Sequence, residues 1–451
     1  MKNILIKSIK VEKLFGKYTY LLPEKGSFCD AAILYGDNGV GKTTLLKVIF
    51  HLLSSANDKG HRTALYKCVF KKIELTLASG VVLTAEKTTD DYLLLEIFKR
   101  KKKLVSWRYR PQSDNKEDDY QMFLDMMAKE TKLKKDSGFD NIPRGNKAYI
   151  NELSMCAPKV YFLSAERFLD TDSNSASIFD IDFKRFIQAE EIKDVKSIIP
   201  RSKEIALTHA LMSASRWISS KAIQGTNKGT SEVHLTYATI LQHLSGSEID
   251  VEIDVQTESM QLLKRFDAIE KKMVDHAKYE LASELPVKEF RKALTIRDIK
   301  KRKLAITLLE PYMKSLEKRI MAIEPVYQLI DNFIITLNGY VYDKEISFTM
   351  SKGFQIIDPK NNKVILISQL SSGEQQLLLL FCNALIARDV PSVFIIDEPE
   401  ISLNVKWQRN LVGSLLEITK DAEIQFIFAS HSIELLAKYR HAVVRMVCGG
   451  H

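Results

Sequence analysis

The segment "GDNGVGKTT", residues 36–44, restricts what this chain can fold into more than any other stretch. It matches the pattern G-x-x-x-x-G-K-[S/T], follows the apolar run Ala31–Tyr35 and precedes apolar residues at helical spacing. Glycines in such a loop allow tight turns and direct backbone amides at phosphate oxygens, while the next helix adds its positive N-terminal end. The sequence therefore predicts an α/β nucleotide-binding core.

Two residues of this loop have defined chemical tasks. Lys42 supplies a positive charge for the β- and γ-phosphates of a nucleoside triphosphate, and the Thr43 hydroxyl is a ligand for Mg²⁺. We expect the other loop residues to surround the phosphates: Gly36, Asp37, Asn38, Gly39, Val40, Gly41 and Thr44.

Two later apolar strands end in residues that can take part in hydrolysis. "SVFIIDEPEISLN" (392–404) reaches Asp397 and Glu398, and "IQFIFASHSIELL" (424–436) reaches Ser430 and His431. Polar residues at the carboxyl ends of parallel strands lie where α/β sheets bind ligands. We expect Asp397 to hold Mg²⁺, Glu398 to act as general base toward water, and His431 to sense the γ-phosphate.

A second Gly/Ser-rich segment, "LSSGEQQ" (370–376), precedes a long apolar helix. Ser371 and Ser372 offer hydroxyl groups, and Gly373 allows close backbone approach at the positive end of that helix. The local pattern also predicts an N-cap of the S-x-x-Q type, built on Ser372 and Gln375.

Taken in this order, the motifs resemble those of the ATP-binding-cassette (ABC) ATPases. The resemblance implies ATP and Mg²⁺ as cofactors. It also implies that Ser371, Ser372, Gly373 and Glu374 cap the γ-phosphate held by the loop of a second copy. Two copies would then enclose two ATP molecules as a homodimer, with a higher homo-oligomer as an extension.

Further details narrow the resemblance. Glu374 and a long insertion are similar to the SMC, Rad50 and OLD group of ATPases, and "IIDEPEISLNVKWQ" (395–408) resembles the "DEPE-x-SLH" stretch of OLD-type and antiphage-defence ATPases. Asn404 stands where a His is usual. The segments 8–22 and 32–54 look most like the ATPase subunit of the PARIS antiphage system, with the Septu ATPase second. This implies a sensor and scaffold that answers a phage-encoded trigger and controls a toxic nuclease, of Toprim type for PARIS or HNH type for Septu.

The implied fold is an α/β ABC ATPase head, with a mixed sheet around the phosphate loop and an antiparallel β subdomain, split by a helical insertion. We expect one lobe at 1–165, the insertion at 166–330 and a second lobe at 331–451. The alternating run 69–109 predicts an antiparallel meander. Strands are also expected at 159–168, 332–337, 346–350, 354–357 and 363–368, and helix breaks at 225–231, Pro286 and Pro311. The segment 257–285 shows no sustained heptad, so no long coiled coil is expected.

Composition restricts which other classes of protein this chain can belong to. The net charge of +9, from 66 Lys and Arg against 57 Asp and Glu, permits contact with nucleic acid but does not require it. The five cysteines form no C-x-x-C pair, which argues against a disulfide framework or zinc site and fits a cytoplasmic protein. The apolar run 377–387 is too short to span a membrane. The basic runs 98–103 and 297–303 are expected to be solvated, and Arg167 is a weaker candidate phosphate contact.

Two other functions remain open at this point. The first is a DNA-repair or DNA-end-binding ATPase of the Rad50 kind, and the second is a scaffold that binds ATP without turnover. The intact pair Asp397 and Glu398 counts against the second. Because the chain ends soon after His431, we expect any nuclease effector to be a separate protein.

Overall fold

The computed structural model describes residues 4–57, 59–111, 144–165, 169–171, 198–230, 238, 241, 254–283, 285–401 and 403–446. The chain forms two compact units, one made of Met1–Lys193 with Ala387–His451 and the other of Asp194–Ile386. These bounds differ from the expected lobes. The serine segment 371–374 and its helix belong to the middle unit, because that helix packs on another helix of the same unit.

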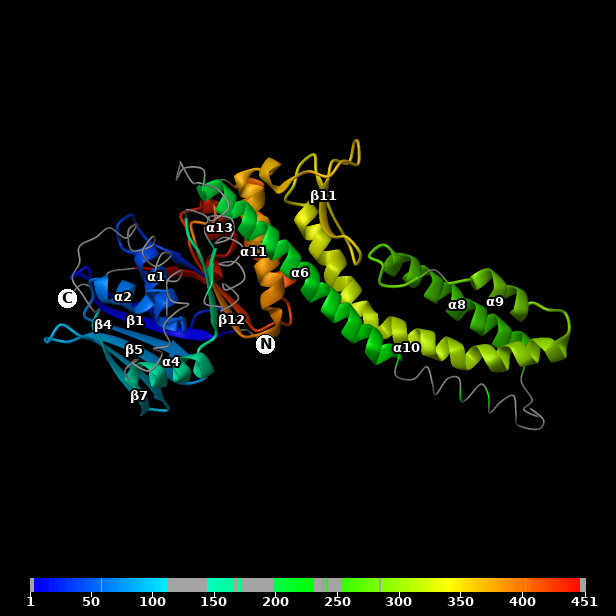
Figure 1. Ribbon diagram of the computed structural model, residues 1–451, viewed down its shortest axis with the longest axis horizontal. Coiled ribbons are helices and arrows are strands. Elements are labelled where there is room, and N and C mark those ends of the chain that lie inside the picture. The colour runs from blue at the N-terminus through cyan, green and yellow to red at the C-terminus, as the bar shows by residue number, and fades with distance from the viewer. Residues whose placement is uncertain are drawn as a thin grey trace, which may run out of the picture. The chain divides into compact units, whose positions relative to one another are not determined.

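The first unit contains a six-stranded sheet with the order β14-β3-β13-β12-β8-β9, of which β12 is labelled in Figure 1. All neighbouring pairs are parallel except β8 and β9. The strands are β3 (Ala31–Tyr35), β8 (Lys159–Leu163), β9 (Leu169–Thr171), β12 (Ser392–Asp397), β13 (Ile424–Ala429) and β14 (Val443–Arg445). Every residue of β12 and β13 is buried, as expected for strands covered on both faces.

A second six-stranded sheet is wholly antiparallel, with the order β2-β1-β4-β5-β6-β7. Its strands are β1 (Ile6–Leu14), β2 (Tyr18–Leu22), β4 (Lys72–Leu77), β5 (Val81–Lys87), β6 (Leu93–Lys99) and β7 (Lys102–Tyr109). The predicted meander is therefore confirmed. The basic run 98–103 covers the β6–β7 turn, where Arg100 and Lys101 have positive φ angles of 49° and 68°.

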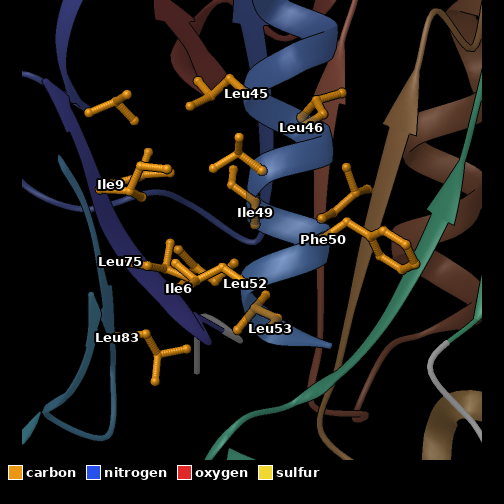
Figure 2. Close-up of a cluster of buried hydrophobic side chains, with 14 of the residues drawn as sticks. Ile6, Ile9, Leu45, Leu46, Ile49, Phe50, Leu52, Leu53, Leu75 and Leu83 are labelled. Carbon is orange, nitrogen blue, oxygen red and sulfur yellow. The ribbon is translucent and has the colours of Figure 1, made fainter. Parts of the chain in front are cut away.

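The core of this unit lies around helix α1 (Lys42–Leu53). Leu45, Leu46, Ile49 and Phe50 of α1 are buried in one cluster with side chains of both sheets, as Figure 2 shows. The helix that begins at the phosphate loop is thus fixed by apolar packing along its length. The remaining helices of the unit are α2 (His61–Lys67), α4 (Arg144–Cys156), η3 (Ala387–Asp389), α12 (Val405–Ile418), α13 (Ile433–Lys438) and η4 (Arg440–Ala442).

One side chain joins the two sheets by hydrogen bonds. Gln425 of β13 is fully buried. Its Oε1 accepts the backbone N–H groups of Leu5 and Ile6, at 3.0 and 2.7 Å, and its Nε2 donates to the carbonyl groups of Ile6 and Cys29, at 3.1 and 2.9 Å. A buried amide needs all these partners, so the position of β1 is tied to β13.

The middle unit is mostly helical, as expected. Its elements are α6 (Ile198–Thr230), α8 (Val255–Ala277), α9 (Val287–Leu294), α10 (Ile299–Asn338), β10 (Glu345–Thr349), β11 (Gly353–Ile357), η2 (Ile367–Gln369) and α11 (Ser372–Ile386). The predicted strands near 346–350 and 354–357 are confirmed as the antiparallel pair β10 and β11.

Several predicted boundaries are wrong. Residues 332–337 are helical, because Ile330, Phe333, Ile334 and Leu337 form the buried stripe of α10. Pro311 lies inside the same helix and does not end it. Helix α6 continues through the predicted break up to Thr230. Residues 363–368 form no strand beyond a single bridge at Val364, followed by η2.

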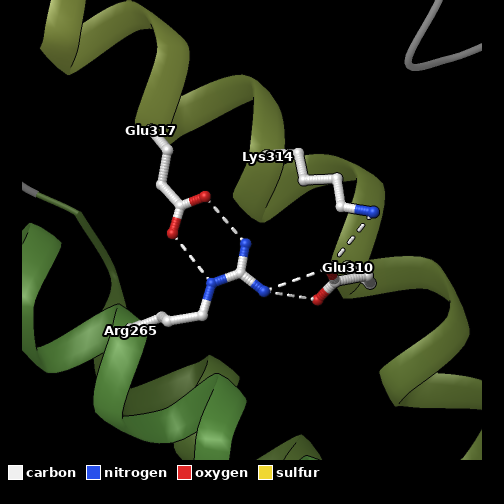
Figure 3. Close-up of polar contacts among 4 residues, drawn as sticks. All are labelled: Arg265, Glu310, Lys314 and Glu317. Carbon is white, nitrogen blue, oxygen red and sulfur yellow. Dashed lines mark hydrogen bonds and ion pairs between the residues drawn. The ribbon is translucent and has the colours of Figure 1, made fainter.

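Helices α8 and α10 pack against each other, and the buried positions of α8 show a heptad spacing that the sequence of 257–285 alone did not indicate. The buried positions of α8 are Ser259, Leu262, Phe266, Ile269, Met273 and His276, which alternate steps of three and four. Across the pair, Arg265 binds Glu310 and Glu317 with closest distances of 2.8 Å (Figure 3). We call this pair of helices, with α9, the arm.

By length and composition alone, α10 could cross a membrane, since a window within it has a mean hydropathy of 1.3. A third of that window is buried within the fold. Ile330, Phe333, Ile334 and Leu337 of this helix are buried within the fold, and Glu324 and Asp331 form ion pairs with Lys272 and Lys278.

Candidate functional site

Three strand ends form one row in the first unit. Asp397 of β12 is aligned with Ala429 of β13, and Ala429 is aligned with Leu34 of β3. The residues that follow each strand therefore emerge at the same edge of the sheet. This register brings the phosphate loop, the Asp397–Glu398 pair and the Ser430–His431 pair to one edge.

The phosphate loop depends on glycine where the helix begins. Gly41 is the N-cap of α1, with φ 90°, and a Cβ there would lie 2.9 Å from Cε2 of Phe15. Gly39 also has a positive φ of 83°. The hydroxyl of Tyr20 donates to the carbonyl of Val40 at 2.8 Å, which anchors the loop to the antiparallel sheet. Larger residues at these glycines would strain the backbone or clash.

The Lys42 side chain is buried within its own loop. Its Nζ donates to the carbonyl oxygens of Gly36 and Asp37, at 2.8 and 2.9 Å. Burial lowers the Lys42 pKa, while the negative charges of Glu398 and Asp397 oppose that shift. An ammonium group has three donors, so one remains for a phosphate oxygen after these two bonds.

Asp397 has the properties of a metal ligand. It is 2% exposed, and burial raises its pKa, whereas a hydrogen bond from the Thr43 side chain lowers it. Its Oδ1 is buried and has no hydrogen-bond partner among the residues that the structure describes. A buried carboxylate oxygen needs a partner. The carboxylate and the Thr43 hydroxyl are oxygen donors of the kind that Mg²⁺ prefers, so this pair fits the ion.

Glu398 is held in an unusual backbone conformation. Its φ is 48°, in the left-handed region that non-glycine residues rarely adopt. Its N–H donates to the carbonyl of Ala429 at 2.9 Å, and its carbonyl accepts the N–H of Ile401 at 3.2 Å. These bonds hold a half-buried carboxylate directly beside Asp397. Strained backbone of this kind is frequent at functional sites.

Glu400 completes this edge, although the sequence reasoning gave it no role. Its carboxylate accepts the Ser430 hydroxyl at 2.9 Å and the N–H groups of His431 and Ser432 at 2.7 and 3.1 Å. These three bonds fix the turn after β13, while His431 itself is exposed. The signal in the sequence was Glu400, the third acid of "DEPE". Asn404 caps α12 by accepting the N–H of Trp407 at 2.9 Å, which gives that side chain a structural role.

The serine segment lies in the middle unit, and its cap differs from the prediction. The reciprocal pair is Ser371 with Glu374: Ser371 N–H donates to Glu374 Oε2 at 2.7 Å, and Ser371 Oγ accepts Glu374 N–H at 3.3 Å. Gln375 instead donates to the carbonyl groups of Ile367 and Leu370. Ser371 and Ser372 are exposed, whereas Gly373 and Glu374 are buried. Arg167 lies outside the described residues.

Comparisons with known proteins agree with a nucleotide site. A family model described as "AAA domain, putative AbiEii toxin, Type IV TA system" matches residues 213–437. The spermidine/putrescine import ATP-binding protein PotA of Fusobacterium nucleatum is 33% identical over 20% of this chain and 23% of its own length. The Retron Ec83 probable ATPase of Escherichia coli is 27% identical over 28% of this chain and 26% of its own. The alignments thus span about a quarter of each curated relative.

The solved structures that align with this chain have lower sequence identity and low structural similarity. The Smc head domain derived from Pyrococcus furiosus aligns over 96% of this chain and 91% of its own, with 13% identity and a TM-score of 0.33. The Smc head domain derived from Pyrococcus yayanosii aligns over 96% and 93%, with 14% identity and a TM-score of 0.33. At these scores the likeness carries no argument about function or assembly.

Proposed function

We propose that this chain is a P-loop ATPase, which hydrolyses ATP as the sensor and scaffold subunit of a defence system and controls a separate nuclease. The observation that carries the ATPase part is the row of strand ends, since it assembles Lys42, Asp397, Glu398 and His431 at one edge. The defence part is supported by the toxin-linked description of the matching family and by the likeness to a retron ATPase.

Each of these residues of the first unit has one role in the proposed hydrolysis of ATP. The loop amides and Lys42 bind the β- and γ-phosphates. Thr43 and Asp397 hold Mg²⁺, which neutralises charge on the phosphates when it is bound. Glu398 accepts the proton of the attacking water, and His431 approaches the γ-phosphate. Glu400 keeps the backbone of His431 in place through its hydrogen bonds.

The second half of the site comes from another copy of the chain. Ser371 and Ser372 are exposed hydroxyls at the N-terminal end of α11, where a helix favours an anion. We propose that they cap the γ-phosphate held by the loop of the partner copy, so that ATP binding drives formation of a homodimer, with a higher homo-oligomer built on it.

A phosphate-release assay with two variants tests the ATPase. We expect Lys42→Ala to lose ATP binding, and Glu398→Gln to bind ATP but hydrolyse it about 100-fold more slowly, because the general base is lost. Glu417→Gln, at an exposed position on α12, is the matched control and should hydrolyse at the parental rate. Parental hydrolysis by Glu398→Gln would show that the base is assigned wrongly.

The effector can be tested by co-expression. We expect a nuclease encoded beside this chain, of Toprim or HNH type, to co-purify with it. Growth should arrest when a phage-encoded trigger is added, and Lys42→Ala should prevent the arrest. Arrest by the nuclease and trigger without this chain would contradict the proposed control.

The arm supports a second candidate, a DNA-end-binding ATPase of the Rad50 kind. The buried side chains of α8 that pack on α10 follow heptad spacing, which the sequence alone did not indicate. That candidate predicts DNA binding whose affinity falls steeply as salt rises. DNA binding measured at low and at physiological salt concentration tests this candidate. If DNA binding is undetectable at low salt, the DNA-end-binding function is excluded.

A further inference from the structure

The Glu374 carboxylate is buried in the middle unit and forms an ion pair there. The residue is 3% exposed. Nζ of Lys344 lies 3.0 Å from its Oε1 and 3.3 Å from its Oε2, and Oε2 also accepts the N–H of Ser371 at 2.7 Å. The Lys344 side chain is itself only 22% exposed. Both oxygens of the carboxylate therefore have a partner inside the unit, and burial keeps the group away from solvent.

These bonds determine which groups the serine segment presents. Since Ser371 Oγ accepts the N–H of Glu374, the hydroxyl hydrogen of Ser371 remains as a donor on an exposed side chain. The N–H groups of Ser372 and Gly373 belong to the first turn of α11, which has no intrahelical acceptors for them. The segment therefore offers donors, which fit phosphate oxygens.

We propose that Lys344 is a positioning residue of the composite nucleotide site. Its ammonium neutralises Glu374 and keeps this carboxylate in the cap, so that Ser371 is held as a donor toward the γ-phosphate of the partner copy. Without Lys344, a buried unpaired carboxylate would lie within one helical turn of the phosphate and would repel it. This inference rests on the proposed function, and it replaces the expectation that Glu374 contacts the nucleotide.

The segment that carries Lys344 is anchored on both sides. It connects α10 to β10. The Asn338 amide binds the backbone of Ile346, accepting its N–H at 2.7 Å and donating to its carbonyl at 3.0 Å. The Tyr340 ring lies 5.2 Å from that of Phe381 on α11. Lys344 is therefore held by defined contacts rather than by its ion pair alone.

The experiment compares three substitutions by steady-state ATPase kinetics and by binding of a fluorescent ATP analogue. We expect Lys344→Met to lower kcat about tenfold or more while the analogue still binds the phosphate loop of the same chain. Lys344→Arg retains the charge and should stay within about threefold of the parental kcat. Lys363→Met, at an exposed position beyond β11, is the matched control and should be parental.

Two further variants separate positioning from folding. In Lys344→Met with Glu374→Gln no charge is left buried and no carboxylate repels the phosphate, so the protein should melt close to the parental temperature and recover much of the kcat that Lys344→Met alone loses. In the Ser371→Ala background, Lys344→Met should cause little further loss, because Lys344 acts through Ser371. A parental kcat for Lys344→Met, or full additivity with Ser371→Ala, overturns the proposal.

Failure of the inference can be told from failure of the proposed function. If Lys42→Ala abolishes hydrolysis and Lys344→Met does not affect it, the ATPase assignment stands and only the role of Lys344 is refuted. If Lys42→Ala hydrolyses ATP normally, the proposed function itself is wrong.

Discussion

At the scale of residues, the nucleotide edge combines groups that are unfavourable to bury alone. Lys42 and Asp397 are both almost fully buried, and each has part of its hydrogen-bonding capacity unused by the loop and strand around it. In the proposed function, a triphosphate with its metal ion would supply the missing partners for both. Binding should therefore relieve a cost that is already present in the folded chain.

Substitution of Asp397 tests the metal site. We expect Asp397→Asn to raise the Mg²⁺ concentration that gives half-maximal hydrolysis by at least about tenfold, because a charged ligand oxygen is lost. A magnesium titration of phosphate release measures this shift. Asp421→Asn is a suitable control, since Asp421 is exposed and its φ of 65° also suits asparagine. An unchanged titration for Asp397→Asn would contradict the assignment.

Two neighbouring histidines, His51 (half-buried) and His61 (buried), should make stability depend on pH. The Nδ1 atoms of His51 and His61 lie 2.9 Å apart, and burial lowers the pKa values of these residues to about 4 and about 2. Both values lie below the unfolded value of about 6.5. Stability is therefore present above pH 6.5 and is lost as the pH falls toward the folded values.

Urea unfolding at several pH values measures this effect. We expect the free energy of unfolding to fall by about 2 kcal/mol or more between about pH 7 and pH 5. In His51→Gln the loss should be smaller. An equal slope in both proteins would show that other groups cause the acid sensitivity.

At the scale of elements, the arm is stabilised chiefly by apolar packing. Phe266 is fully buried between α8 and α10 and stacks on Phe290 of α9, with ring centroids 4.9 Å apart. The ion pairs of Arg265 are about a third exposed, so they contribute about 1 kcal/mol or less each. Loss of Phe266 should therefore affect the arm more than loss of Arg265.

Hydrogen exchange can localise that effect. We expect Phe266→Ala to lower the free energy of opening of the arm by about 3 kcal/mol or more, as for other large-to-small core changes. Val274→Ala on the same helix removes a side chain that is 61% exposed and should change exchange little. Similar exchange in the two variants would mean that α8 does not pack as described.

At the scale of the whole molecule, the proposed sandwich makes a prediction about mixtures. A copy with Lys42→Ala lacks a working loop, and a copy with Ser371→Ala and Ser372→Ala lacks the capping hydroxyls. Each is expected to be inactive alone. In a mixed dimer one of the two sites is intact, so an equal mixture should recover about a quarter of the parental rate. Absence of any recovery, with mixed dimers shown to form, would exclude a shared site.

The sequence predicted best what is encoded in contiguous residues. The phosphate loop, the strand before it, the helix after it, and the acids at the end of β12 follow from short patterns with local physical reasons. Partners distant in sequence were missed, such as Glu400 for the turn at Ser430 and Lys344 for Glu374. No local pattern indicates which carboxylate a lysine thirty positions away will meet.

The helical insertion was predicted less well for similar reasons. A run rich in β-branched residues suggested a strand at 332–337, but the buried stripe of α10 outweighed that local preference. The heptad of α8 was hidden because two of its buried positions are Ser259 and His276. Only the facing helix shows that these polar residues belong to the packed seam.

The fourfold bonding of Gln425 has a consequence for how the molecule can be switched off. The strand that carries this amide ends two residues before His431, which the proposed function places near the γ-phosphate. A partner that bound β1 and pulled it away would remove three of the four hydrogen bonds of the Gln425 amide, those to Leu5 and Ile6, and leave the amide buried without them. Displacement of β1 would thus destabilise the sheet edge that carries the phosphate loop, although the partner makes no contact with that edge.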